Sequence, residues 1–309
     1  MQIAVLGNVF IDYKGWSGEF YDPVGRNQGR IEIVHGGVAR NVAENLALLG
    51  IKPEFVTTLG QDSVSDMVAM RLCENNVSLT YSGKYANNAI GMWLAILGNS
   101  GQLLGSISQL ADMQLLEDLI LEKLPSITAH IKNIAMDIDL TPCIAEKIIE
   151  HVQKDGVKLY ALPGNLTVIK PNPHIFKYME CFICNDIEAG KLLDEEMQPK
   201  NIEHSKAMVK ALCSKFKLKQ AVITLGEYGS VYCDPHGNLG YQDIYPTVVN
   251  DTTGAGDAFF SAAVAALIRG NTLAQAVQAG SKLASVILAR SENTCHCLSK
   301  SQLENIFSK

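Results

Sequence analysis

The chain has 309 residues, of which 47% are hydrophobic, so it is long enough to bury the core of one large α/β domain or two small ones. Its formal net charge is −6 without a basic cluster, which argues against partners such as nucleic acid or an anionic membrane surface. The longest apolar stretches are too short or too interrupted to span a bilayer.

The N-terminal residues and the cysteines indicate the compartment. Met1–Gly7 has the pattern of a strand and lacks the basic region and the cleavage site of a signal peptide. Eight cysteines without a secretory signal are typical of reduced thiols, so we expect a cytoplasmic protein. Cys181–Cys184 and Cys295–Cys297 contain possible zinc ligands, but the first stretch lies in an apolar run typical of a buried strand. We therefore favour buried structural cysteines over a zinc site or a disulfide.

Strands and helices are expected to alternate along most of the chain. The apolar patterns predict strands at residues 3–6, 53–60, 134–137, 157–162, 181–184 and 221–225, and an apolar, strand-like run that ends at Val249. Helices are predicted at residues 63–75 after the cap Asp62, 113–123, 142–154 after the cap Thr141, 254–269 and 273–288. This alternation predicts an α/β fold with a doubly wound, mostly parallel sheet and helices on both faces. Without a visible repeat or linker, we expect a single domain over residues 1–309.

Two strand-rich insertions interrupt the alternation, at about residues 13–35 and 88–108. Glycines and a proline break up the first insertion, and Arg30–Val34 alternates as a strand does. In the second, two strand-like runs flank the turn Gly98–Gly101, which is a hairpin signal. We expect these segments to form a small separate β-sheet.

The stretch Asp251–Phe260 reads Asp-Thr-Thr-Gly-Ala-Gly-Asp-Ala-Phe-Phe at the start of a long helix. Gly254 and Gly256 remove side chains where a turn becomes a helix, so backbone N–H groups can converge on an anion. Asp257 then lies one turn into the helix, where it can accept a proton from a hydroxyl that attacks a phosphate. The alternative is a glycine turn followed by an acidic residue, which is favoured near any helix start.

A second glycine-led helix lies more than 200 residues upstream. Gly36–Gly50 reads Gly-Gly-Val-Ala-Arg-Asn-Val-Ala-Glu-Asn-Leu-Ala-Leu-Leu-Gly, with Asn41 on the first turn. These two stretches, in this order, resemble the two signatures of the ribokinase (phosphofructokinase-B-type) family of carbohydrate and nucleoside kinases, and the resemblance runs essentially from end to end. It implies an ATP-dependent phosphotransferase with a ribokinase-like fold, in which the small sheet is a lid that excludes water.

The resemblance also implies roles for individual residues. It places the substrate at Asp12, Gly36, Gly37 and Asn41, and a carboxylate suits a vicinal diol because it can accept two hydroxyl hydrogen bonds. It makes Asp257 the catalytic base, and it makes Gly254, Ala255 and Gly256 an anion hole for the transferring phosphoryl group.

Three further stretches are implied to bind the nucleotide and its cations. Asn185-Asp186-Ile187-Glu188 matches the family's NxxE pattern, which implies that Asn185 and Glu188 hold Mg²⁺ through water near ATP; helix capping is the alternative. Thr224, Gly226 and Gly229 form a TxGxxG turn that lines the nucleotide, or else an ordinary hairpin turn. Asp251 and Thr253 would bind a monovalent cation such as K⁺. Ser285, Ala289 and Asn293 fall near the family's adenine pocket and cation loop, with ordinary helix packing as the alternative for Ser285 and Ala289.

The substrate prediction depends on the first signature. The stretch around Arg40 looks more like pseudouridine kinases than ribokinases proper, which usually carry a lysine in that turn. Residues 161–165 depart from the Asp-Pro-Val-Ser stretch of pseudouridine kinases, so no base- or sugar-contacting role is carried over there. We rank the 5′-hydroxyl of pseudouridine first and a free sugar such as ribose, fructose or a keto-deoxy sugar acid second.

Two other classes of protein and an assembly are also considered. A nucleotide- or sugar-binding regulator without turnover ranks lower, because Asp257 and the glycines are intact. A dehydrogenase ranks lowest, because no GxGxxG follows the first strand. Lid strands of the family often pair between two chains, so we expect a homodimer. Trp93 in the second insertion would pack on a substrate ring, on a partner's lid or in the lid core.

Overall fold

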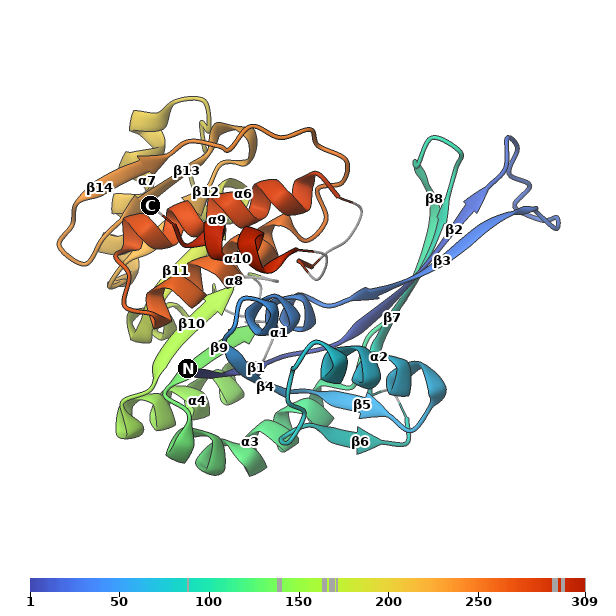
Figure 1. Ribbon diagram of the computed structural model, residues 1–309, viewed down its shortest axis with the longest axis horizontal. Coiled ribbons are helices and arrows are strands. Elements are labelled where there is room, and N and C mark those ends of the chain that lie inside the picture. The colour runs from blue at the N-terminus through green and yellow to red at the C-terminus, as the bar shows by residue number, and fades with distance from the viewer. Residues whose placement is uncertain are drawn as a thin grey trace.

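The computed structural model describes residues 1–87, 89–137, 141–162, 166, 170, 172–290, 294–295 and 298–308. These residues form a layered α/β body from which a second, twisted sheet projects (Figure 1). The long helix found in the C-terminal part of the body packs close to the first helix of the chain. No helix in the described part of the chain is long and apolar enough to cross a membrane.

The large sheet runs through the body in the order β14-β13-β12-β11-β10-β9-β1-β4. Its strands pair in parallel from β4 to β12, and β13 and β14 extend it antiparallel. The strand bounds are β1 (Gln2–Leu6), β4 (Lys52–Val56), β9 (Asn133–Asp137), β10 (Lys158–Leu162), β11 (Met179–Asn185), β12 (Ala221–Thr224), β13 (Ser230–Cys233) and β14 (Leu239–Gln242). Because parallel strands end at one edge, the loops that follow β1, β11 and β12 share that edge.

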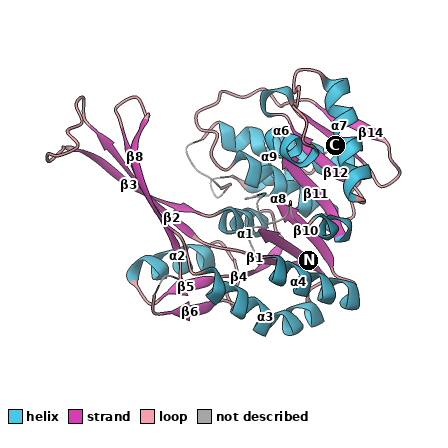
Figure 2. Cartoon of the chain, turned by 180° about the vertical axis from the view of Figure 1, so that it is seen from behind, coloured by secondary structure: helices cyan, strands magenta, loops and turns pink. Residues whose placement is uncertain are grey.

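Helices cover both faces of this sheet and enclose two hydrophobic cores (Figures 1 and 2). One core contains residues of α3 (Met113–His130), α4 (Pro142–Asp155), η1 (Pro173–Tyr178), α6 (Asp186–Leu193) and α7 (Ile202–Phe216). The other contains residues of α1 (Val38–Leu48), α2 (Ser63–Glu74), α8 (Ala255–Ile268), α9 (Leu273–Leu288) and α10 (Lys300–Ile306). Side chains of β1 alternate between the two, with Ala4 in the first core and Val5 in the second. The doubly wound, mostly parallel sheet that the sequence predicts is therefore confirmed.

The second sheet, which we call the lid sheet, has the strand order β3-β2-β7-β8 and extends away from the body (Figure 2). Its strands are β2 (Phe10–Ser17), β3 (Gly29–Gly36), β7 (Gly91–Leu97) and β8 (Leu103–Gln109). The predicted hairpin turn is present, because the Gly98 N–H donates to the Gln102 carbonyl at 2.9 Å. The first strand begins at Phe10, earlier than the predicted insertion at 13–35. Asn88, where the second insertion was predicted to begin, lies outside the described residues.

Three predicted elements differ from the structure. The single strand at 53–60 is wrong: it divides at Thr57, and β5 (Thr58–Gly60) pairs with β6 (Gly83–Tyr85) instead of with the large sheet. The helix at 113–123 continues to His130, because Leu124 and Ile127 beyond the predicted end are buried. Thr141 precedes α4 as predicted, but its side chain makes no capping hydrogen bond.

The strand-like run ending at Val249 is also wrong. The described chain between Gln242 and Asp251 contains no strand. Pro246 has no N–H to contribute to a ladder, and the side chains of Val248 and Val249 are 86% and 57% exposed. Helix α8 therefore follows an exposed extended segment instead of a buried strand.

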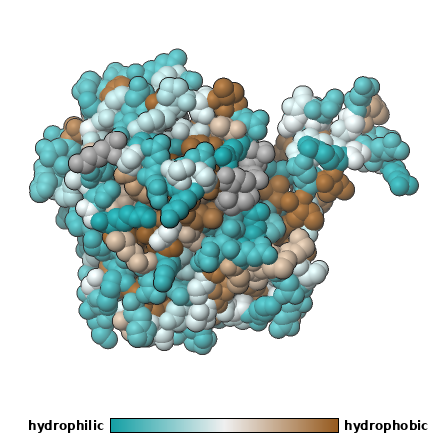
Figure 3. Space-filling view, viewed as in Figure 1, coloured by the Kyte–Doolittle hydropathy of each residue, from teal (hydrophilic) through white to brown (hydrophobic). Residues whose placement is uncertain are grey.

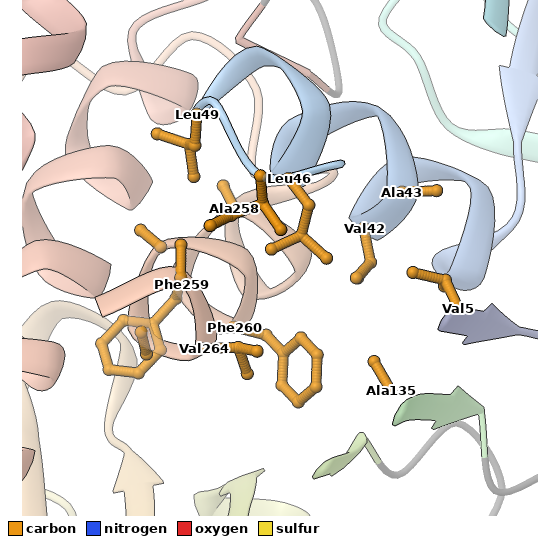
Figure 4. Packing of buried hydrophobic residues seen from close by; sticks show 14 of the residues in the cluster. Val5, Val42, Ala43, Leu46, Leu49, Ala135, Ala258, Phe259, Phe260 and Val264 are labelled. Atoms are coloured by element: carbon orange, nitrogen blue, oxygen red, sulfur yellow. The ribbon is translucent and has the colours of Figure 1, made fainter. Parts of the chain in front are cut away.

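Helices α1 and α8, which carry the two signature stretches, pack directly against each other. Figure 4 shows Val42 and Leu46 of α1 beside Ala258 and Phe260 of α8. The alanines of α8 allow the helices to approach closely, since most of its residues from 258 to 266 are buried. This packing brings the N-terminal turns of both helices to the same place.

Candidate active site

Asn41 and Asp257 form the centre of the candidate site. The Asn41 side-chain amide donates to Asp257 Oδ2 at 2.7 Å, across 216 residues of sequence. Each residue lies on the first turn of its helix, after a glycine with positive φ: 92° at Gly37 and 80° at Gly254. A Cβ at Gly37 would lie 2.7 Å from the Asn8 carbonyl oxygen, so only glycine fits this turn.

The Asp257 carboxyl has the properties of a general base. Burial raises its pKa to about 6, against the Asn41 hydrogen bond and the positive charge of Arg40, which both lower it. A base with a pKa near 6 is mostly ionised at neutral pH and still accepts a proton readily. The Asn41 side-chain oxygen is buried and has no partner among the described residues, so it remains available to a substrate donor.

Asp12 lies beside the first signature. It is the third residue of β2, so it belongs to a strand and does not cap a loop. A Cβ at Gly36 would lie 3.0 Å from Asp12 Oδ2, so the absent side chain leaves room for the carboxylate. Burial raises the pKa of Asp12, opposed by the charges of Lys14 and Arg40. Within the described part of the chain nothing donates to this carboxylate, which can therefore accept substrate hydroxyls.

Arg40, next to Asn41, belongs to a buried ionic network that the sequence analysis missed. Its guanidinium donates to Glu44 Oε2 at 2.7 Å, and the two side chains are 1% and 0% exposed. It also donates to the carbonyl oxygens of His35 and Gly36. The Glu44 carboxylate accepts further hydrogen bonds at 2.9–3.0 Å from Arg71, Asn75 and Thr294. The i,i+4 spacing of Arg40 and Glu44 was the available signal, but spacing alone does not reveal burial.

The predicted nucleotide-binding residues gather at the ends of β11 and β12. Asn185 and Thr224 are paired neighbours in the parallel register. After Thr224 the chain turns through η2 (Gly226–Tyr228), with φ of 59° at Gly226 and 81° at Gly229. The Leu225 N–H donates to the Gly229 carbonyl at 2.8 Å and closes the turn. The structure thus brings these four residues together, at the sheet edge where α/β proteins bind ligands.

Asn185 and Glu188 form a complete capping box. The Glu188 N–H donates to Asn185 Oδ1, and the Asn185 N–H donates to Glu188 Oε2, both at 2.8 Å. The capping alternative is therefore confirmed. It occupies one carboxylate oxygen, and no hydrogen bond from the described residues reaches Glu188 Oε1. Burial raises the pKa of Glu188 despite the Asn185 hydrogen bond, so the site would gain from a nearby cation.

The loop before α8 is joined to the end of α9. The Asn250 N–H donates to the Leu288 carbonyl at 2.7 Å, and the Thr253 N–H donates to Asp251 Oδ1 at 2.8 Å. Burial would raise the pKa of Asp251, but the hydrogen bonds from Thr253 and the charge of Lys14 hold it below its usual value. Asp251 is therefore ionised at neutral pH.

Several predicted residues do not join the site in the described structure. The Ser285 hydroxyl donates to the Lys282 carbonyl at 2.8 Å and Ala289 ends α9, as in ordinary helix packing. Asn293, residues 163–165, His296 and Cys297 lie outside the described residues. Cys181 and Cys184 are buried in β11, as expected. No group of three or more His, Cys, Asp or Glu side chains in the described ranges is placed to hold a metal ion.

Comparison with known proteins agrees with this geometry. The model of the pfkB family carbohydrate kinases matches residues 1–300. A guanosine-inosine kinase of Exiguobacterium acetylicum is 33% identical over 293 residues, which cover 94% of this chain and 96% of the relative. A pseudouridine kinase of Escherichia coli (strain K12) is 24% identical over 290 residues, which cover 93% and 90%.

The fold has close counterparts among solved structures. The structure of Arabidopsis thaliana ribokinase complexed with ribose and ATP superposes with a TM-score of 0.81 at 20% identity, covering 99% of this chain and 98% of that one. At that identity the structural similarity shows the ribokinase-like fold alone. The family match over residues 1–300 shows the type of reaction. The chain belongs to the pfkB family of carbohydrate kinases and is an ATP-dependent phosphotransferase that acts on an alcohol group.

Proposed function

We propose that this kinase phosphorylates the 5′-hydroxyl of a ribonucleoside. The observation that carries the proposal is the Asn41–Asp257 hydrogen bond, which places a base with a pKa of about 6 at the start of α8, near the free carboxylate of Asp12. The similarity to a guanosine-inosine kinase, 33% identical over 94% of this chain, favours a purine nucleoside as acceptor. Pseudouridine is the second candidate, supported by the relative that is 24% identical.

The proposed reaction assigns one task to each group. Asp12 accepts hydrogen bonds from ribose hydroxyls and turns the 5′-hydroxyl toward Asp257. Asp257 takes the hydroxyl proton while the oxygen forms a bond to the γ-phosphorus of ATP, and the bond from that phosphorus to the bridging oxygen breaks to release ADP. The backbone N–H groups of Gly254, Ala255 and Gly256 stabilise the charge of the transferring group. One such donor is typically worth roughly 10²–10³ in rate.

The cations are part of the same proposal. Asn185 and Glu188 would hold Mg²⁺ through its water shell, which suits the free Glu188 Oε1 and the preference of Mg²⁺ for hard oxygen ligands. The ion would neutralise phosphate charge when bound. The ionised carboxylate of Asp251, together with Thr253, would hold a monovalent cation such as K⁺ beside the start of α8.

We also propose that two chains associate through the lid sheet. The strand register aligns Ile33, Tyr13, Leu94 and Ile107 in one row across the face opposite to Asp12. Ile33, Leu94 and Ile107 are 48%, 44% and 70% exposed, which is unusual for three aligned apolar side chains. Figure 3 shows apolar surface where the lid meets the body, on an otherwise largely polar face. A second lid would bury this row.

A substrate panel tests the proposed function. Purified protein with Mg·ATP is offered guanosine, inosine, adenosine, uridine, pseudouridine, ribose, fructose and 2-keto-3-deoxygluconate, and ADP and the phosphorylated product are measured. We expect a nucleoside 5′-monophosphate as the product, with guanosine and inosine as the best substrates. Turnover on a free sugar alone would overturn the nucleoside proposal and leave the phosphotransferase assignment intact.

A further inference from the structure

The central lid strand presents two charged side chains to the candidate site. Side chains two residues apart in a strand share a face, so Asp12 and Lys14 of β2 point to the same side. At the base of the lid the opposite face of β2 packs on the body, because Ile11 is fully buried and Tyr13 packs against the second core, whereas Ile33, Leu94 and Ile107 on the other strands of that face are exposed. The face with Asp12 and Lys14 is the one beside Gly36, since a Cβ at Gly36 would lie 3.0 Å from Asp12 Oδ2.

Trp93 lies on this same face. In the parallel register of β2 with β7, Trp93 is the direct partner of Asp12, and Ala95 is the partner of Lys14. Paired residues of neighbouring strands point to the same side, so the indole stands beside the carboxylate. Trp93 is partly exposed and makes no hydrogen bond or ring contact with the described residues.

Lys14 has no acceptor of its own in the described structure. Its ammonium forms neither a hydrogen bond nor an ion pair there, whereas Lys84 pairs with Asp66 at 2.7 Å. In the register of the lid sheet, Lys14 and Ala95 form the next residue pair on the same face after Asp12 and Trp93. A partly buried ammonium in that position is available to a ligand.

We propose that Trp93 and Lys14 form the nucleobase subsite of the proposed nucleoside kinase and select a 6-oxopurine. The inference rests on the proposed function, which it deepens. With the ribose hydroxyls on Asp12, the base lies along the lid strand, stacked on the Trp93 indole. The Lys14 ammonium donates to O6 and N7 at the edge of the base.

The chemistry of Lys14 determines the preference. An ammonium has three donors and no acceptor, so it pairs with the O6 and N7 acceptors of guanosine and inosine. Adenosine keeps the N7 acceptor but presents an amino group, which is a donor, in place of O6, so it offers the ammonium one acceptor fewer. Lys14 is two residues beyond Asp12, about 7 Å at roughly 3.3 Å per residue, so it meets the edge of a base whose ribose is on Asp12.

The first test compares inosine with adenosine. Wild-type protein should have a kcat/KM for inosine at least about 10-fold above that for adenosine. Lys14→Met should abolish the difference by lowering the inosine value more than the adenosine value, since the bond to O6 is lost for inosine alone and a hydrogen bond to a charged group contributes about 1.5–3 kcal/mol. Lys84→Met is the control and should behave as wild type. Equal loss on both nucleosides, or none, would overturn the role of Lys14. If pseudouridine is the only nucleoside used, the 6-oxopurine subsite is wrong and the nucleoside kinase stands.

The second test measures binding without turnover. The chain has two tryptophans, so Trp16→Phe leaves Trp93 as the sole tryptophan. Trp93→Phe leaves Trp16, which stacks on the Arg30 guanidinium at 4.2 Å. Inosine should quench the fluorescence of the Trp16→Phe protein and leave that of Trp93→Phe unchanged. Trp93→Ala should raise the KM for inosine by about 10- to 100-fold, and Trp93→Phe should restore most of it. Quenching in the Trp93→Phe protein but not in the Trp16→Phe protein would overturn the stacking role of Trp93. An unchanged KM in Trp93→Ala would overturn it as well. Ribose turnover without any nucleoside turnover would refute the proposed function itself.

Discussion

Asp257 should impose an acid limb on the pH dependence of the reaction, and Asn41 should determine where that limb lies. With a pKa of about 6, the base is about nine-tenths ionised at pH 7 and about one-tenth ionised at pH 5. kcat/KM should therefore fall roughly 10-fold between these values. The Asn41 amide donates to the ionised Asp257 carboxylate and therefore lowers the pKa of Asp257. Removal of the Asn41 amide must raise that pKa.

The size of the shift follows from that hydrogen bond. A hydrogen bond to a charged group contributes about 1.5–3 kcal/mol, and one pKa unit corresponds to about 1.4 kcal/mol, so Asn41→Leu should move the acid limb upward by about 1–2 units. The assay is kcat/KM for the best substrate from pH 5 to 9. Asp12→Asn is the matched control, since it should lower kcat/KM without moving the limb. A wild-type limb near pH 4, or an unmoved limb in Asn41→Leu, would refute the assignment of Asp257.

Three further outcomes are expected. Glu44→Gln leaves the buried Arg40 guanidinium without its counter-charge and should lower the free energy of unfolding in urea by about 3–5 kcal/mol. The control Glu150→Gln, at the exposed pair with Lys147, should lower it by less than about 1 kcal/mol. Equal losses in the two variants would contradict the importance of burial. Glu188→Gln should raise the Mg²⁺ concentration needed for half-maximal turnover about 10-fold, while its circular dichroism spectrum stays that of the folded protein. An unchanged Mg²⁺ requirement would show that Glu188 does not belong to the metal site. Ile107→Glu should convert the proposed dimer to a monomer in sedimentation, and a wild-type protein that is monomeric at all concentrations would end that proposal.

The pH dependence of the free energy of unfolding tests the Glu44 network independently. Burial raises the pKa of Glu44, but Arg40 and Arg71 outweigh it and hold the pKa below its usual value. A carboxyl with a depressed folded-state pKa stabilises the fold above its unfolded pKa, and this contribution is lost as pH falls through the folded value. The difference in stability between wild type and Glu44→Gln should therefore shrink below about pH 4.5.

The elements that carry a strong local pattern were predictable from the sequence. The long helix that begins after Gly254 and the hairpin around Gly98–Gly101 have glycines at the required turns and apolar residues at the right period. The separation of β5 from β4 was not predictable, because the two strands follow each other with only Thr57 between them and only the pairing of Thr58–Gly60 with β6 distinguishes them. The run before Asp251 misled the prediction for the opposite reason: its valines are apolar but exposed, and Pro246 interrupts any ladder.

The sequence predicted which residues belong to the candidate site but not which contacts they make with one another. Asn41 and Asp257 could be named from the two signatures, yet their hydrogen bond depends on the packing of α1 against α8, which no local pattern specifies. The burial of Arg40 and Glu44 likewise depends on groups from α2 and from Thr294, far away in sequence. Lys14 gave no signal because a lysine in an amphipathic strand is ordinary, and only the register of the lid sheet reveals what it faces.

If Asp257 is the base of a phosphoryl transfer to a hydroxyl, its removal must slow the transfer step itself. Single-turnover transfer from Mg·ATP to the best acceptor of the panel is compared between wild type and Asp257→Asn, with ATP binding measured for both proteins. We expect the variant to bind ATP normally and to lose at least about 10²–10⁴ in the rate of transfer, the usual contribution of a positioned base. Transfer at the wild-type rate by a folded Asp257→Asn protein would show that Asp257 is not the base.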